Sequence, residues 1–450
     1  MLNLLGRQFK LCDGVSRRGF LRIGGLGLAG LTLPAVLRMR EAQASNRRRD
    51  SAVILYWMAG GPSHIDTYDM KPNAPAEVRG PFRASPTRVS GLSLCELLPG
   101  HIRIADKLAI VRSLHHGNAN HFDASHWAQT GYHVPNIMGR GQPYPAQGAV
   151  VSRLRGANRP DMPPYVCLPE GYSPNLGFYQ QAAYLGAEHN PIDGGGEPGY
   201  RGRILQPTFL PPRELSLPRV ADRRELLRRI DVLTRRVESS GEFRAMDSSY
   251  QRAFGLITSQ RAKDAFDLSR EPLTLRERYG TPAWGKAALL ARRLVEAGVT
   301  FVTINHYEAD IDWWDDHYTI ERNLRRRLPL FDQALSSLVE DLHVRGLGDR
   351  VLVVACGEFG RSPRIDSLAG RGHWNRAYSA LLAGGGIRAG QVVGATSADG
   401  GVPSDRPLLP GDLLATIYRV LGIDHDSMLP DRQNRPIRLC DPGQPIAELF

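Results

Sequence analysis

Apolar runs as long as a β-strand recur along the chain, and segments with helical periodicity separate some of them. The unbroken runs at 52–58 and 351–356 are typical of strands buried on both faces of a parallel sheet. Residues 285–297 repeat apolar side chains at helical spacing, end at a glycine and lead into another apolar run at 299–305. Helix, glycine and buried strand form the repeat unit of α/β proteins. The pattern therefore predicts an α/β fold with parallel strands.

Weaker patterns add further elements to this fold. Strands are predicted at 108–113, 163–169 and 378–383, each from a short apolar run. The segment 124–130 is stopped by a glycine and predicts a short helix, and 328–345 predicts a long amphipathic helix. These elements belong to the same α/β pattern.

The chain is expected to form a single domain over residues 45–450 with two insertions. Residues 170–220 are rich in Gly, Pro, Asn and aromatic residues, which predicts a loop-rich insertion over one face of the sheet. Residues 221–283 carry apolar side chains at helical spacing between Arg and Glu, which predicts a helical insertion. At 450 residues with 42% hydrophobic content, the chain can bury a large core.

Residues 1–44 have the pattern of an export signal. Ser16-Arg17-Arg18-Gly19-Phe20-Leu21 is a twin-arginine sequence, followed by an apolar stretch at 23–37 and by Ala42-Gln43-Ala44, a small-x-small cleavage site. The apolar stretch is too short and too rich in glycine to span a membrane. We therefore expect export by the twin-arginine translocase to the periplasm or the cell exterior. No transmembrane segment is expected in the mature chain.

Charge and cysteine usage narrow the function classes. The formal net charge falls from +11 to +6 without residues 1–44, because these hold seven Arg and Lys against two acidic residues. This mild surplus gives no reason to expect a nucleic-acid partner, whereas acidic small molecules and anionic envelope polymers remain open. The four later cysteines match no zinc-ribbon spacing. Cys167 and Cys356 lie in apolar runs and are expected to be small buried hydrophobes.

Candidate chemistry concentrates where the run at 351–356 ends. Glu358, Arg361 and His373 follow it within one loop region. In open α/β sheets ligands bind at the carboxyl ends of the strands, so these three side chains predict a site. The alternative is a capped strand end with a surface salt bridge.

Two further candidates follow the first strand. His64 and Asp66 come directly after Gly60-Gly61, where the backbone can pass close to a ligand. Both are candidate metal ligands. The alternative is a turn stabilised by short polar side chains.

Histidines cluster between the predicted strand at 108–113 and the short helix that follows it. Five of the 13 histidines lie within residues 115–133. His121 and Ser125 would face an anion at a helix N-terminus, and a histidine there could be a nucleophile, a proton carrier or a metal ligand. For His115 and His133 we expect exposed loop positions instead.

Acidic residues and histidines also concentrate at 306–317. This segment holds five carboxylates and two imidazoles beside two tryptophans, and partly buried carboxylates need a cation. Asp315 and His317 are spaced to share one divalent metal.

Taken together, these patterns resemble the bacterial family called domain of unknown function 1501. That family is placed with sulfatases and phosphomutases in the alkaline phosphatase-like superfamily. The resemblance implies a three-layer α/β/α sandwich with a mainly parallel central sheet and, in active members, a two-metal site at the strand ends. It is carried by the twin-arginine leader and by Gly60-Gly61-Pro62-Ser63-x-x-Asp66-Thr67-x-Asp69, Asn120-His121, Trp314-Asp315-x-His317, Glu358-Phe359-Gly360-Arg361-Ser362-Pro363, Gly372-His373-Trp374 and Gly384-Gly385-Gly386.

The chain also departs from that superfamily's pattern. An ungapped count from Gln129-Thr130-Gly131 places His121 at the nucleophile position. The metal-binding Asp expected after the first strand is replaced by Met58-Ala59-Gly60, and the last-strand Asp-His pair is replaced by Glu358-Phe359. The scaffold is therefore implied more strongly than the superfamily's usual chemistry.

The hypothesis is an exported hydrolase that acts on a sulfate or phosphate ester, including esters on polysaccharides. A divalent metal (zinc, calcium or magnesium) would polarise the ester, with His121, Ser125 and Arg361 as catalytic residues. The alternative is a non-catalytic envelope protein that binds a glycan or another partner on a degenerate scaffold. The predicted metal ligands are His64, Asp66, Asp315, His317, Glu358 and His373.

Overall fold

The computed structural model describes most of the chain as one compact unit, Asp50–Phe450. The predicted leader at 1–44 lies outside the described residues, as do most of the two predicted insertions. The described residues are 50–168, 172–173, 178–194, 259–280, 283–305 and 314–450.

An eight-stranded sheet forms the centre of this unit, with strand order β14-β4-β13-β10-β1-β9-β5-β8. The pairings make β13 the one strand of this sheet that runs against its neighbours. The predicted mainly parallel sheet is thus confirmed. The strands are β1 (Ala52–Trp57), β4 (Leu108–Leu114), β5 (Tyr165–Leu168), β8 (Ile192–Asp193), β9 (Phe301–Asn305), β10 (Val351–Cys356), β13 (Tyr378–Gly384) and β14 (Gln391–Val393).

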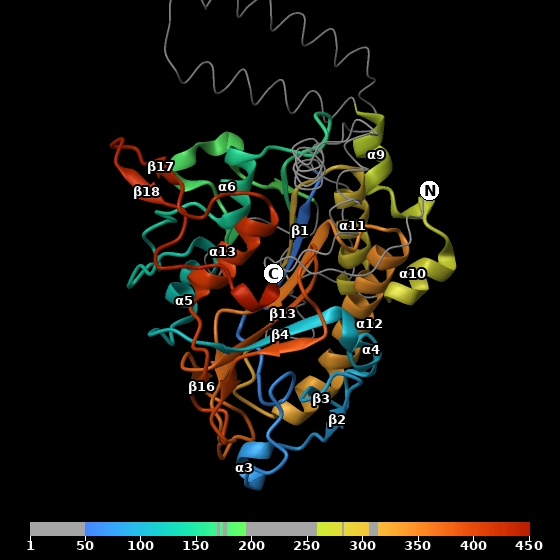
Figure 1. The fold of residues 1–450 in the computed structure, drawn as a ribbon, viewed down its shortest axis with the longest axis vertical. Helices are drawn as coiled ribbons and strands as arrows, with labels where there is room; N and C mark the ends of the chain where they lie inside the picture. Colours follow the sequence, from blue (N-terminus) through green and yellow to red (C-terminus); the bar gives the residue numbers. More distant parts are fainter. Residues whose placement is uncertain (1–49, 169–171, 174–177, 195–258, 281–282, 306–313) are drawn as a thin grey trace, which may run out of the picture. The chain divides into compact units, whose positions relative to one another are not determined.

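Helices cover both faces of the sheet (Figure 1), which confirms the predicted α/β/α sandwich. β1 is buried along its whole length because its side chains alternate between two hydrophobic cores. Ile54 and Tyr56 belong to one core, and Val53 and Leu55 to the other. The first core contains α9 (Gln260–Phe266), α10 (Leu273–Tyr279), α11 (Ala283–Ala297) and α12 (Ile320–Val344), and the second α5 (His121–Thr130), α6 (Gln147–Leu154) and α13 (Pro410–Val420).

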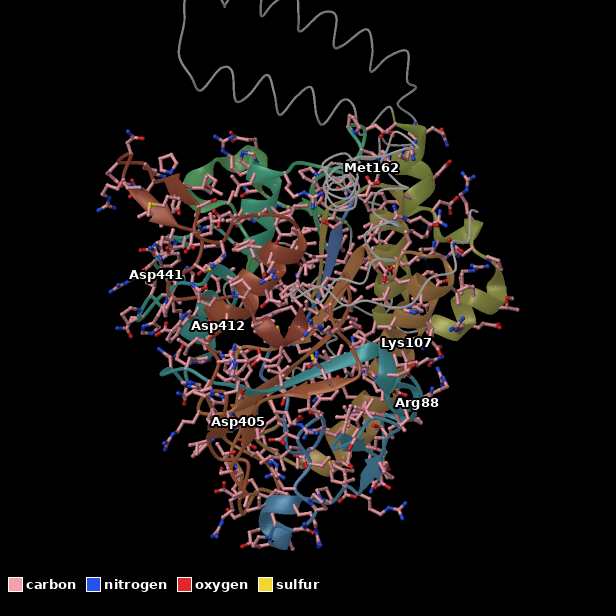
Figure 2. All side chains as sticks on the ribbon, viewed as in Figure 1. Arg88, Lys107, Met162, Asp405, Asp412 and Asp441 are labelled. Carbon is pink, nitrogen blue, oxygen red and sulfur yellow. The ribbon has the colours of Figure 1, made fainter. Side chains whose placement is uncertain are left out.

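Side chains occupy the space between the sheet and both helical layers (Figure 2). Asp412, labelled in Figure 2, accepts a hydrogen bond from the backbone N–H of Leu409 at 2.8 Å and so caps α13. All four cysteines of the described residues are buried and unpaired, including Cys167 and Cys356, which were expected to be small buried hydrophobes. Among the described residues, no helix combines the length and the apolar character needed to cross a membrane.

Short elements extend from the sheet and position its loops. The small helices are α3 (Ala76–Arg79) and α4 (Pro99–Arg103), with 3-10 turns η1 (Ala105–Lys107), η3 (Ala183–Leu185), η4 (Ala187–His189), η5 (Leu268–Arg270) and η6 (Ala447–Leu449). The two-stranded pairs are β2 (Ala84–Pro86) with β3 (Ser93–Cys95), β6 (Tyr172–Ser173) with β7 (Phe178–Tyr179), β11 (Gly360–Arg361) with β12 (His373–Trp374), β15 (Ala395–Thr396) with β16 (Pro403–Asp405), and β17 (Met428–Pro430) with β18 (Pro436–Arg438).

Two helices begin earlier than the sequence pattern predicts. α5 starts at His121 rather than 124, because the side chain of Asn120 accepts hydrogen bonds from two backbone N–H groups of the first turn. α12 starts at Ile320 rather than 328 and contains Pro329. Each early start lengthens the helix at its N-terminal end.

Candidate metal centre

Four candidate ligands converge beside the carboxyl ends of β1 and β10. His121, Asp315, His317 and His373 each offer one ligand atom, and these atoms all lie within 4.8 Å of one another. His121 is the first residue of α5, and His373 lies in β12. Asp315 and His317 follow Trp314, whose backbone N–H donates to the carbonyl of Ala59 at 2.9 Å. Segments distant in sequence therefore meet at one point.

Glu358 orients the imidazole of His121. Its Oε1 accepts a hydrogen bond from His121 Nδ1 at 2.6 Å and another from the backbone N–H of Gly60 at 2.8 Å. Because Nδ1 carries the proton, Nε2 of a neutral His121 has a lone pair. That nitrogen lies 3.2 Å from Asp315 Oδ2. A lone pair and a carboxylate oxygen at this distance repel each other unless a proton or a cation lies between them.

His373 shows the same arrangement, and His317 lies beside it. His373 Nδ1 donates to the carbonyl of Ala119 at 2.9 Å, which leaves the Nε2 lone pair of the neutral ring pointing into the cluster. The two Nε2 atoms of His317 and His373 are 2.8 Å apart. They lie 3.0 and 3.2 Å from Asp315 Oδ1. Three imidazole nitrogens thus surround one carboxylate.

The charges of the cluster shift several pKa values. Burial opposes ionisation of Asp315, but the imidazoles of His121 and His373 beside it and the charge of Arg361 outweigh burial and hold its pKa well below the usual range. Burial also opposes protonation of His121, yet Asp315 and Glu358 raise its pKa to about 9. For His317, burial lowers the pKa despite the nearby Asp315 charge. Without a metal, His121 would therefore hold the proton that separates it from Asp315.

The donor set fits a divalent transition metal. Imidazole nitrogens together with a carboxylate are typical ligands of zinc, whereas calcium and magnesium prefer oxygen ligands. His121 and His373 already donate their second ring nitrogen to an acceptor, as metal-ligating histidines usually do. In addition, Glu358 Oε2 is buried and has no hydrogen-bond partner among the described residues. Of the three metals considered from the sequence, zinc matches these ligands best.

Arg361 does not lie where the predicted anion clamp would need it. Its side chain is fully buried, and Nε donates to the carbonyl of Gly61 at 2.9 Å. Nη1 donates to the carbonyl of Arg371 at 3.2 Å, and Nη2 contacts both the carbonyl of Gly60 and Asp315. The guanidinium thus fixes a metal-ligand candidate and the turn after β1, and the protein itself occupies its donors.

The structure keeps His64 and Asp66 apart from the cluster. Asp66 is completely buried in an ion pair with Arg371, at 2.7 Å from Nε. His64 is buried, its Nε2 donates to the carbonyl of Gly400 at 2.8 Å, and burial lowers its pKa. The sequence alone could not distinguish His64 and Asp66 from the residues of the cluster, because both groups follow the ends of predicted strands. Arg371, which neutralises Asp66, had no recognisable signal in the sequence.

Ser125 lies one helical turn after His121 on the same face of α5. Its hydroxyl is buried and has no hydrogen-bond partner among the described residues. His133 is exposed, as expected, and its Nε2 lies 2.9 Å from the amide nitrogen of Asn118. His115 is partly buried and lies outside the cluster.

The fold and this site define an α/β protein with a candidate metal centre at the carboxyl ends of its strands. The chain belongs to the family described as "Protein of unknown function (DUF1501)", whose model matches residues 50–450. The family inferred from the sequence motifs is thereby confirmed. No curated protein is similar enough to the sequence to count as a match.

Several solved structures are similar to this chain at low identity. A 2-O GAG sulfatase shares 10% identity with a TM-score of 0.40, over 88% of this chain and 73% of that one. Ps i-CgsB in complex with k-i-k-neocarrahexaose shares 12% identity with a TM-score of 0.38, over 83% and 72%. A phosphonate monoester hydrolase of Agrobacterium radiobacter shares 14% identity with a TM-score of 0.34, over 88% and 78%. These likenesses assign no activity to this chain.

Proposed function

We propose that this protein is an exported, metal-dependent hydrolase of sulfate or phosphate esters. The observation that carries the proposal is the convergence of His121, Asp315, His317 and His373 on one point beside the strand ends. A site of this kind lies where α/β proteins bind ligands. The exported location rests on the twin-arginine pattern at 16–21.

The side chains of the cluster divide into ligands and positioning groups. His121, Asp315, His317 and His373 would hold the metal, which when bound supplies a Lewis acid for the ester oxygen. Glu358 fixes the tautomer of His121 through the 2.6 Å hydrogen bond to Nδ1. Arg361 holds Asp315 in place from the buried side. In this assignment His121 Nε2 is a ligand, so the same nitrogen is not the attacking group.

A second candidate function is non-catalytic binding of a glycan or another envelope partner. The specific observation in its favour is the guanidinium of Arg361, the expected anion clamp, whose donors already contact three backbone carbonyls and Asp315. A binding protein could retain the metal centre for stability while lacking a group that holds a transferring sulfate or phosphate.

Ester hydrolysis by the metal-loaded protein distinguishes the two functions. A panel of aryl sulfates, phosphates and phosphonates should include at least one substrate that the wild type turns over, with activity lost after chelation and restored by zinc. His121→Ala and Glu358→Ala should lose most of that activity, and His133→Ala, an exposed histidine outside the cluster, should keep it. Turnover that survives both substitutions would indicate a contaminant. Absence of turnover with a fully loaded site would favour the binding protein.

A further inference from the structure

An open groove of about 910 Å³ lies between α3, the first turns of α12 and the loop that joins β11 to β12. Its floor is largely apolar and includes Pro81, Ile320 and Ile365. Backbone hydrogen bonds connect its walls: Ile365 donates to Glu77 at 2.8 Å and Ile320 donates to Ala369 at 2.9 Å. The groove is therefore built into the fold, and its volume is in the range of ligand-binding clefts.

Positive charge lines one side of this groove. Arg322, Arg325 and Arg326 are exposed on the first turns of α12 and, at this spacing, share one face of the helix. The acidic groups of the groove already have partners: Glu321 lies 2.8 Å from Arg325, and Glu77 lies 3.6 Å from Arg364. Arg322 has no ion-pair partner in the described part of the chain. The positive end of the helix dipole adds to this charge, so the groove is complementary to an anion.

Only a short stretch of chain separates the groove from the metal centre. His317 belongs to the cluster, and Thr319 and Ile320, two and three residues later, line the groove. Between them Tyr318 is 62% exposed, and its ring centroid lies 6.4 Å from that of His317. The tyrosine thus leaves much of its ring exposed to solvent on the segment that joins the metal centre to the groove.

We infer that this groove binds an anionic polysaccharide chain, with the ester to be cleaved at the metal centre. Sugar rings have apolar faces that fit the floor and Tyr318, and regularly spaced sulfate or phosphate groups fit the row of arginines. The inference rests on the proposed function for the reaction, but the binding itself needs no turnover. It names the substrate class as an acidic oligosaccharide several sugars long rather than a small ester.

Binding to oligosaccharides of defined length tests this inference. The probes are end-labelled dextran sulfates of two, four and eight sugars, with uncharged dextran of the same lengths, and the readout is fluorescence anisotropy with the full protein. The wild type should bind the sulfated octamer at least about tenfold more tightly than the dimer, and uncharged dextran only weakly. An Arg322→Glu, Arg326→Glu double variant should lose about tenfold for the octamer and little for the dimer.

The matched control reverses two charges elsewhere on the surface. Arg88→Glu with Lys107→Glu, both labelled in Figure 2, changes the net charge by the same amount. Neither residue lines the groove. This variant should bind the octamer like the wild type.

Equal binding of dimer and octamer by the wild type, or unchanged octamer binding by the Arg322/Arg326 variant, would overturn the inference. Equally tight binding of an eight-residue polyglutamate would overturn the inference and indicate that the groove binds an acidic peptide rather than a glycan. Retained octamer binding in a protein without esterase activity would refute only the proposed hydrolysis.

Discussion

Glu358 shows how one buried side chain can determine the chemistry of several others. One of its oxygens accepts two hydrogen bonds, from His121 and from the backbone of Gly60, and thereby links α5 to the turn after β1. Its other oxygen is buried and has no hydrogen-bond partner among the described residues. Burying a carboxylate with one oxygen unpartnered is costly unless a positive charge lies close to it.

Glu358→Gln should therefore weaken metal binding without unfolding the protein. The amide keeps the size of the side chain but removes the negative charge that holds the proton on His121 Nδ1. Loss of such a supporting group typically lowers metal affinity by about 10- to 100-fold. Calorimetric titration of zinc into the metal-free protein measures the change. Glu340→Gln, at a surface ion pair with Arg103, is the control and should leave the affinity unchanged. A change within twofold for Glu358→Gln would contradict this role.

Arg361 acts by position rather than by contact with substrate. Its guanidinium is fully buried against three backbone carbonyls and Asp315. Arg361→Ala should lower the free energy of unfolding by about 3–5 kcal/mol, because a buried charge and several buried acceptors lose their partner. Urea denaturation of the metal-free protein measures this loss. Arg325→Ala removes an exposed arginine paired with Glu321 and should cost at most about 1 kcal/mol. Equal effects of the two substitutions would refute the structural role of Arg361.

At the scale of elements, the turn after β1 controls how closely the metal-ligand segment approaches the sheet. Gly60 has a φ of +105°, and a Cβ on it would lie 2.7 Å from the backbone nitrogen of Asp315. Both the backbone conformation and the space therefore require glycine. A side chain here would push the Asp315 segment away from the strand ends.

Gly60→Ala should consequently cost both stability and metal binding. Gly91 provides the matched control, because it also has a positive φ, +75°, but a Cβ there would meet nothing within 4 Å. Gly91→Ala should lower the free energy of unfolding by about 1 kcal/mol from backbone strain alone and leave zinc affinity unchanged. Gly60→Ala should cost at least twice as much and reduce zinc affinity as well. Thermal unfolding and zinc titration of both variants measure the difference, and equal behaviour would show that the close approach is unimportant.

Most strands of the central sheet and the helix predicted at 285–297 were predictable. Their apolar patterns reflect burial on both faces of a strand or along one stripe of a helix. The start of α5 was not recognised, although Asn120 is a strong helix-capping residue and was the available signal. α12 was predicted too short because Pro329 and the arginines before it interrupt the apolar pattern. Ile320, Leu324 and Leu328 are spaced four apart and do continue the buried face.

At the scale of the whole molecule, sheet topology explains which of the predicted site residues lie together in the structure. Strand ends could be located from the sequence, so Asp315, His317, Glu358 and His373 were identified as candidates. Which side chains turn toward one another depends on long-range partners that no local pattern reveals. Arg371 removes Asp66 from the candidate set, and the carbonyl of Gly400 binds His64.

Two buried histidines should make the protein sensitive to acid. Burial lowers the pKa of His116 and of His126 to about 4, although each also donates a hydrogen bond to a carbonyl. In the unfolded chain these rings titrate near pH 6.5, so between about pH 6.5 and 4 only the unfolded state takes up the protons. Stability should be complete above pH 6.5 and fall as the pH decreases, by about 1.4 kcal/mol per pH unit for each ring.

Urea unfolding of the wild type and of His126→Asn at pH 7, 6 and 5 tests this expectation. The free energy of unfolding of the variant should fall less steeply with decreasing pH than that of the wild type. Below pH 6.5 the two slopes should differ by roughly 1.4 kcal/mol per pH unit. His133→Asn, which changes an exposed histidine, is the control and should keep the wild-type slope. Identical slopes for all three proteins would show that His126 is not held neutral by burial.

Metal content tests the central claim most directly. Elemental analysis of the purified protein, before and after chelation and reloading with zinc, should give about one divalent ion per chain that is regained on reloading. His317→Ala and His373→Ala should each retain far less than stoichiometric metal, and His133→Ala should match the wild type. A wild type that neither contains nor regains a stoichiometric ion, or that loads no better than His317→Ala, would contradict the account.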